Sequence, residues 1–126
     1  MRQDVQALIK RMDDFADDII DLVEKMPNTL VGRHISGQLL RSGTSCSSNY
    51  EEACGAESLA DFIHKMQIAL KELRETHFWL RRIIRRDYPV SDQAKVLANT
   101  ANELVLIFSK SVITAKKGKH RDSQQQ

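Results

Sequence analysis

Apolar residues recur at helical spacing along most of this chain, and the clearest pattern lies in residues 2–26. There the steps between apolar positions alternate between three and four, which places these residues on one stripe of a helix. The stripe consists of Val5, Leu8, Met12, Phe15, Ile19, Leu22 and Met26. Pro27 ends the pattern and Thr29 is suited to cap a second helix, so the first two helices are expected to be antiparallel neighbours joined by a short turn.

Residues 30–54 are predicted to form a second helix whose inward positions are mostly small. These positions are Ile35, Leu39, Ser42, Cys46, Asn49 and Ala53. The segment also carries glycine and several serines, which are poor helix formers, so tertiary packing must stabilise it. A small inward face lets neighbouring helices approach closely, as in the inner helix of a bundle. Gly55 is suited to end this helix in the left-handed conformation, and Ser58 with Asp61 resembles a capping box for the next one.

The third predicted helix, residues 59–86, has apolar residues on one face and cations on the other. Its core stripe consists of Leu59, Phe62, Met66, Ala69, Leu73, Thr76, Leu80 and Ile83. The cations opposite that stripe are Lys71, Arg74, Arg82 and Arg85, with Arg81 and Arg86 at the margins. Phe78 lies among these cations, and Ile68 and Trp79 form a second apolar line beside it. We expect these three residues to contact another subunit, although isolated exposed apolar residues are also ordinary.

A fourth helix is predicted over residues 91–115, with Ser91 as its cap and Ala94, Leu97, Ala101, Leu104 and Phe108 on its inward side. Residues 116–126 contain few apolar residues and a glycine, which predicts a flexible basic tail. Its cations are Lys116, Lys117, Lys119 and Arg121. The four segments together predict an all-α, up-and-down antiparallel four-helix bundle over residues 1–115.

Length and composition agree with one soluble domain. The chain has 126 residues, of which 41% are hydrophobic and 29% charged. No run approaches the roughly 18 apolar residues of a membrane span, and the N-terminus lacks the pattern of a secretory signal. We therefore expect a cytoplasmic protein.

Candidate catalytic and metal-binding groups are sparse. Cys46 and Cys54 lie eight residues apart on one predicted helix, roughly 12 Å along its axis, so they are expected to be free thiols. Asp61 and His64 have the spacing of half a di-iron motif, but the remaining ligands are missing and a surface ion pair is the simpler interpretation. His77 falls on the core stripe, where an interior histidine is ordinary. We predict no catalytic residues, metal or cofactor.

Several short motifs in the middle of the chain resemble one known family. They are LRSGTS at 40–45, NYEEA at 49–53, GAES at 55–58 and DFIHKM at 61–66. The chain is similar to bacterial four-helix-bundle proteins related to the proteins encoded in intervening sequences of 23S ribosomal RNA genes, with a mild departure at residues 46–48. The resemblance implies a left-handed bundle, a homopentamer and a proposed role in nucleic-acid binding. Arg41 and Asn49 also resemble positions of this family. We assign these two residues, together with Ser42 and Gly55, to helix packing.

Charge is unevenly distributed, and it leaves two functions open. Residues 1–64 hold 6 cations and 11 anions, whereas residues 65–126 hold 13 cations and 6 anions. The cations of the third helix and the C-terminal segment could bind the phosphates of RNA or DNA with little regard to sequence. Alternatively, they could meet the acidic face of the first helix on another copy, in a homo-oligomeric scaffold. That acidic face consists of Asp13, Asp14, Asp17, Asp18, Asp21 and Glu24.

Overall fold

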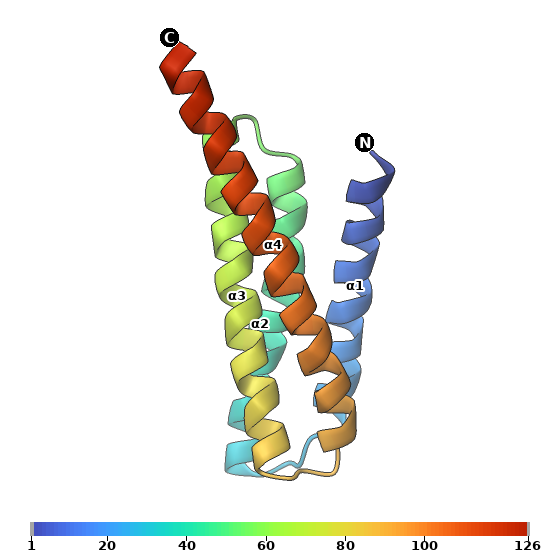
Figure 1. Cartoon of the computed structure of the whole chain (residues 1–126). Helices are drawn as coiled ribbons and strands as arrows, with labels where there is room; N and C mark the ends of the chain where they lie inside the picture. Colours follow the sequence, from blue (N-terminus) through green and yellow to red (C-terminus); the bar gives the residue numbers. More distant parts are fainter. Residues whose placement is uncertain (1, 126) are drawn as a thin grey trace.

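The helical pattern folds into four helices that run alternately up and down (Figure 1). The computed structural model describes the backbone of residues 2–125 and the side chains of residues 2–121, and this range contains no strand. The helices are α1 (Gln3–Glu24), α2 (Leu30–Cys54), α3 (Leu59–Arg85) and α4 (Ser91–Gln125). The predicted all-α four-helix bundle is confirmed.

The inward stripes of all four helices form one hydrophobic core. Its largest fully buried side chains include Phe15 and Ile19 of α1, Leu39 of α2, Leu73 of α3 and Phe108 of α4. The packing is uneven, because α3 contacts α2 and α4 extensively, whereas α1 packs chiefly against α2 and only lightly against α4. Figure 1 shows α4 crossing the bundle obliquely, with the N-terminal end of α1 standing apart from it. On the side of α3 that faces away from the core, Lys71, Arg74, Phe78, Arg81 and Arg85 are exposed.

The small inward face of α2 brings its backbone close to its neighbours, as predicted. A Cβ atom added to Gly43 would lie 2.8 Å from the Cγ2 atom of Ile19, which is closer than real side chains come. One residue earlier in the chain, the buried hydroxyl of Ser42 lies 3.0 Å from that of Thr76 on α3. These two contacts hold α2 between α1 and α3, which explains why the sequence tolerates poor helix formers there.

Two predicted helix caps are present. The backbone N–H of Gly32 donates to Thr29 Oγ1 at 3.0 Å, and that of Asp61 donates to Ser58 Oγ at 3.0 Å. Gly55 differs from the prediction, because its φ is −97° and not left-handed. Its N–H and that of Ala56 donate to carbonyls three and four residues back, so a right-handed turn ends α2 without a left-handed residue.

Ser91 also acts differently from the prediction. Its hydroxyl lies 3.2 Å from the carbonyl oxygen of Ile83 and 2.6 Å from that of Tyr88, so it satisfies the end of α3 and does not cap α4. The tight turn between the helices places Asp87 at a φ of 54°, a left-handed conformation that aspartate tolerates better than most residues.

The fourth helix is longer than predicted. It continues through Gln125, whereas the sequence pattern placed its end at about residue 115 and a basic tail beyond it. Lysine, arginine and glutamine have good helix propensity, and the single Gly118 costs only about 1 kcal/mol. The cations of residues 116–121 therefore lie on an extension of α4 that projects beyond the turn between α2 and α3 (Figure 1).

Candidate nucleic-acid interface

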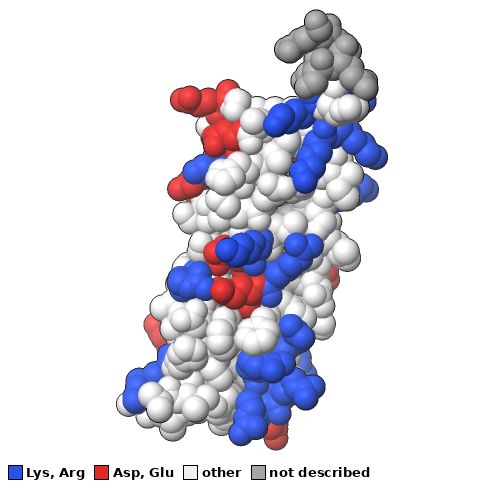
Figure 2. Space-filling model, turned by 90° about the vertical axis from the view of Figure 1, so that its left-hand side faces the viewer, with Lys and Arg blue, Asp and Glu red and all other residues white. Residues whose placement is uncertain are grey.

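The ten predicted nucleic-acid-binding residues all lie on α3, at its end, or on the extension of α4. Figure 2 shows this side of the molecule, with cations gathered toward both ends and a band of mixed charge between them. We call the cations near the end of α3 the lower arginine group, which consists of Arg81, Arg82, Arg85 and Arg86. The upper cationic group consists of Lys71, Arg74, Lys116, Lys117, Lys119 and Arg121.

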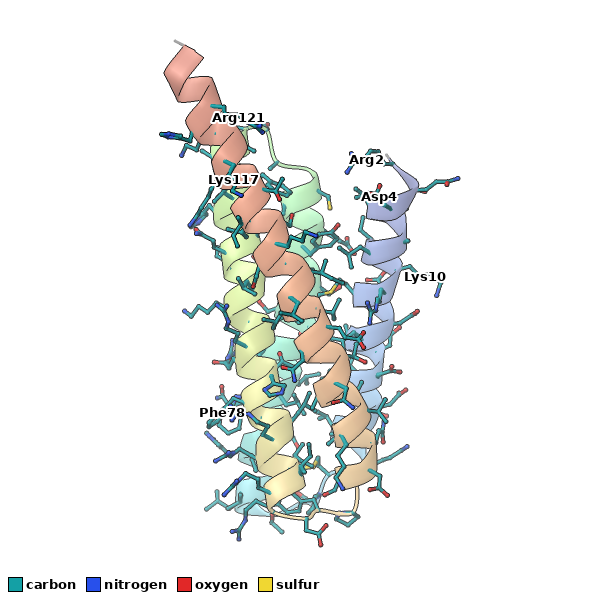
Figure 3. The ribbon with its side chains drawn as sticks, in the orientation of Figure 1. Arg2, Asp4, Lys10, Phe78, Lys117 and Arg121 are labelled. Carbon is teal, nitrogen blue, oxygen red and sulfur yellow. The ribbon has the colours of Figure 1, made fainter. Side chains whose placement is uncertain are left out.

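The tertiary structure joins cations that lie far apart in the sequence. Lys71 and Arg74 of α3 line one shallow furrow with Lys116 of α4, and its volume is about 330 Å³. The furrow continues past Ile113 to the side chains of Lys117 and Arg121, which Figure 3 shows on the α4 extension. Lys119 lines neither part.

None of the ten cations forms an ion pair with another residue that the structure describes. Cations elsewhere are often paired, as Lys65 is with Glu52 at 2.8 Å and Arg11 is with Glu103. The two acidic residues interspersed among the cations of α3 both pair with Arg41 of α2, which bonds Glu72 at 3.1 Å and also contacts Glu75. Arg41 offsets one of these two negative charges. Most of the positive charge of this face is therefore left without internal compensation.

An aromatic residue lies within the cationic face. Phe78 is 38% exposed and lies on the outer side of α3 (Figure 3). The guanidinium carbon of Arg82 lies 4.9 Å from the centroid of the Phe78 ring, and that of Arg81 lies 5.8 Å from it. The ring of Trp79 meets Phe78 edge to face, at 4.9 Å between centroids. Arginine and aromatic rings thus form one cluster near the end of α3.

The three residues expected at a subunit interface differ in how far their side chains are exposed. Ile68 and Trp79 are half-buried, and Trp79 packs against the core and against the ring of His34 at 5.6 Å. The sequence interpretation overlooked a larger exposed set on α4, where Val96, Leu106 and Ile113 are 64%, 71% and 55% exposed. A helical wheel of residues 91–115 could have found them on the face opposite the inward stripe.

The same exposed residues raise the hydropathy of α4. It is a helix long and apolar enough, by length and composition, to cross a membrane, and a third of its apolar window is buried in the bundle. Ala94, Leu97, Leu104 and Phe108 of this helix form part of the core. The apolar character of α4 thus comes from an inward face and from a separate outward one.

The four residues assigned to packing have distinct environments. Ser42 is fully buried, and Asn49 is half-buried and donates to the carbonyl of Ser45 at 2.9 Å. Arg41 is exposed and bridges α2 to α3 through its two glutamates, while Gly55 is exposed in the turn after α2. Arg41 therefore connects two helices on the surface and is not a buried polar group.

Residues 2–121 contain few other groups that could bind a metal ion or act as a nucleophile. No group of three or more His, Cys, Asp or Glu residues among them is placed to hold a metal ion. Both cysteines are free, and burial raises the pKa of the Cys46 thiol to about 12, so this thiol stays protonated. A cleft of about 410 Å³ between the N-terminal end of α1 and the other helices is lined mainly by apolar residues, and the Arg2 and Asp4 side chains at this cleft pair with each other at 3.3 Å.

Comparison with known proteins identifies the family. The model of the 23S rRNA-intervening sequence protein family matches residues 5–110, which include most of α1 to α4. A crystal structure of a protein of unknown function from the S23 ribosomal protein family of Bacteroides thetaiotaomicron is 34% identical, with a TM-score of 0.74. The alignment covers 82% of this chain and 96% of that one. No curated protein matches. The chain therefore belongs to the 23S rRNA-intervening sequence protein family.

Proposed function

We propose that this protein is a non-catalytic oligomer that binds RNA or DNA through the cationic face of α3 and the α4 extension. The observation that carries the proposal is the absence of any ion pair between the ten cations and the rest of the described structure. A face with an excess of cations attracts phosphates and releases the counterions condensed on a nucleic acid. The furrow supports this function because it holds cations from two helices within one hollow.

Such binding is expected to depend on phosphate charge more than on base sequence. Arginine and lysine contacts to phosphates position a nucleic acid, whereas sequence is read by contacts to base edges. In a plot of log affinity against log salt, affinity falls as salt rises. Each phosphate contact adds about 0.9 to the steepness of this fall for B-DNA and about 0.7 for a single strand. The salt slope therefore counts the cations that touch phosphates.

Fluorescence polarisation of labelled RNA and DNA across a salt series tests the proposal. Arg81→Gln with Arg85→Gln removes two cations of the lower arginine group and should reduce the slope by about 1 to 2. Lys116→Gln with Lys117→Gln makes the equivalent change in the upper cationic group. The matched control is Lys10→Gln with Lys65→Gln, because these lysines are paired with Asp14 and Glu52 away from the face. No measurable affinity for either nucleic acid at low salt would reject the function.

A second function, that of a homo-oligomeric scaffold, is favoured by the exposed apolar residues of α4 and by the acidic face of α1. Of the six carboxylates on that face, only Asp14 has an ion-pair partner among the described residues. Burial raises the pKa of Asp18, and the neighbouring charges of Asp21, Asp14 and Asp17 add to the shift, so a cation docked there would relieve repulsion. The family resemblance sets five as the expected number of subunits.

Sedimentation and size exclusion separate the two functions. If the acidic face of one copy meets the arginines of the next, Arg82→Glu with Arg85→Glu should break the oligomer. If instead the cations bind nucleic acid, the same variant should keep its oligomeric size and lose affinity for RNA and DNA. Leu106→Ser with Ile113→Ser tests the apolar face of α4 independently, because it changes no charge.

A further inference from the structure

The cations on the outer face of α3 lie in a row with an aromatic residue at its centre. Lys71, Arg74, Phe78, Arg81 and Arg85 follow one another at steps of three and four residues, so they remain on one side of the helix. The row is roughly 21 Å long at about 1.5 Å per residue. All five residues are exposed. The exposed ring of Phe78 therefore has two cations on each side of it along the helix.

The Phe78 ring contacts side chains on its own helix. Trp79 meets it edge to face at 4.9 Å between centroids, and Trp79 is itself packed against the core and against the His34 ring. The guanidinium of Arg82 lies over the Phe78 ring, while its buried Nε has no hydrogen-bond partner among the described residues. Phe78 and Arg82 thus form one stacked platform, and the guanidinium has no ion pair to break before it meets a phosphate.

We propose that this row binds single-stranded nucleic acid, with an unpaired base stacked on the platform of Phe78 and Arg82 and the flanking phosphates held by the four cations. The inference rests on the proposed nucleic-acid function and specifies its ligand. A base offers its flat face to a protein side chain only when it is unpaired and unstacked, and single strands are commonly bound by aromatic rings and arginine planes. A duplex would use the cations and leave Phe78 without a partner.

The placement of carboxylates and exposed apolar residues also favours a nucleic acid over a second copy of the chain at this row. A second copy would have to bring carboxylates for the four cations and an apolar surface for Phe78. The acidic face of α1 has the carboxylates, but none of the large exposed hydrophobic residues of the described chain lies on α1. The nearest along the chain, Leu30 and Val31, begin α2 beyond the turn. The exposed apolar residues of α4, in turn, have no acidic group comparable to that face.

The fluorescence of Trp79 gives a direct readout, because it is the only tryptophan in the chain. The 126-residue chain is titrated with oligothymidylate, and separately with the duplex that this strand forms with oligoadenylate, at one salt concentration. The single strand is expected to bind more tightly and to change the Trp79 emission, since the stacked base lies next to a ring in contact with Trp79. The duplex is expected to leave the emission nearly unchanged.

Phe78→Leu keeps an apolar side chain but removes the aromatic face, and it should weaken single-strand binding roughly tenfold while duplex binding changes little. Phe78→Tyr retains the face and should bind like the original protein. Leu40→Ala is the matched control, because it alters an apolar residue of α2 with the same 38% exposure as Phe78 and should change neither affinity. Circular dichroism and size exclusion verify that each variant keeps its fold and its oligomeric size.

The possible results have distinct meanings. Equal affinity for the single strand and the duplex, with Phe78→Leu unchanged, would overturn the stacking inference and leave the nucleic-acid function standing. Absence of binding to both probes at low salt would overturn both. Dissociation of the oligomer by Phe78→Leu, with nucleic-acid binding unaltered, would identify a second copy of the chain as the partner of Phe78 and so also overturn the inference.

Discussion

Thr76 of α3 and Ser42 of α2 bring their hydroxyl oxygens to 3.0 Å in a contact where neither residue is exposed. Thr76 Oγ1 also lies 2.8 Å from the carbonyl oxygen of Glu72, and Ser42 Oγ lies 3.4 Å from that of Leu39. Each hydroxyl has one hydrogen to donate, so the two groups share their hydrogens over these three contacts. The pair is well satisfied only while both hydroxyls are present.

Replacing Thr76 with valine is expected to lower the free energy of unfolding by about 1–2 kcal/mol, because it leaves the Ser42 hydroxyl buried with one long hydrogen bond. The double variant Ser42→Ala with Thr76→Val removes both polar groups and should cost less than the two single changes together. Urea unfolding of the three variants measures the difference. Additive costs would show that the two hydroxyls are not coupled.

Gly43 and Gly37 of α2 offer a matched pair of substitutions. Alanine at Gly37 meets no atom within 4 Å and should stabilise the protein by up to about 1 kcal/mol through helix propensity. Alanine at Gly43 would meet the branched side chain of the buried Ile19, whose three nearest carbons cannot all move away. The resulting overpacking, about 1–3 kcal/mol, should outweigh the same gain in propensity. A midpoint temperature of thermal unfolding that shifts in the same direction for both variants would contradict this packing.

The two thiols are expected to differ in reactivity. Cys46 is fully buried with a pKa raised to about 12, whereas Cys54 is half-buried beside the cleft near α1. An aromatic disulfide reagent should therefore modify Cys54 in the folded protein and Cys46 only after denaturant is added. Mass spectrometry identifies the modified residue, and Cys54→Ser should abolish the native-state reaction. Rapid labelling of Cys46 without denaturant would show that α2 opens readily.

His77 is expected to make the protein less stable in mild acid. Burial, together with the nearby Arg81 guanidinium, holds the pKa of His77 below its ordinary value of 6.5. Well above pH 6.5 the imidazole is neutral in the folded and the unfolded chain, so it contributes nothing there. As pH falls below this value the unfolded chain takes up the proton more readily, and the free energy of unfolding decreases.

The variant His77→Gln should show a smaller loss of stability between neutral and mildly acidic buffer than the original protein. Urea unfolding at several pH values across this range measures the slope. His64→Gln serves as the control, since it replaces an exposed histidine on the same helix. An unchanged slope in the His77 variant would assign the acid sensitivity to other groups.

The elements and their inward faces could be predicted because helix formation is local and periodic. The stripe from Val5 to Met26 and the one from Leu59 to Ile83 identify which sides of α1 and α3 are buried, and Thr29 and Ser58 mark helix starts through bonds within one turn. The cations of α3 could be assigned to its outer face for the same reason. The length of α4 could not be predicted in this way. The helix propensity of its lysines, arginines and glutamines outweighs the cost of Gly118 only when α4 is already anchored in the bundle.

What the sequence alone determined about this protein is a set of four amphipathic helices and the side of α3 on which its cations and Phe78 lie. Three relationships come from the tertiary structure alone: Arg41 pairs with the two glutamates between those cations, Lys116 joins Lys71 and Arg74 in one furrow, and the Trp79 ring meets that of Phe78 edge to face. The physical reason is that helical period is a property of neighbouring residues, whereas charge compensation and ring support depend on which helices become neighbours in space.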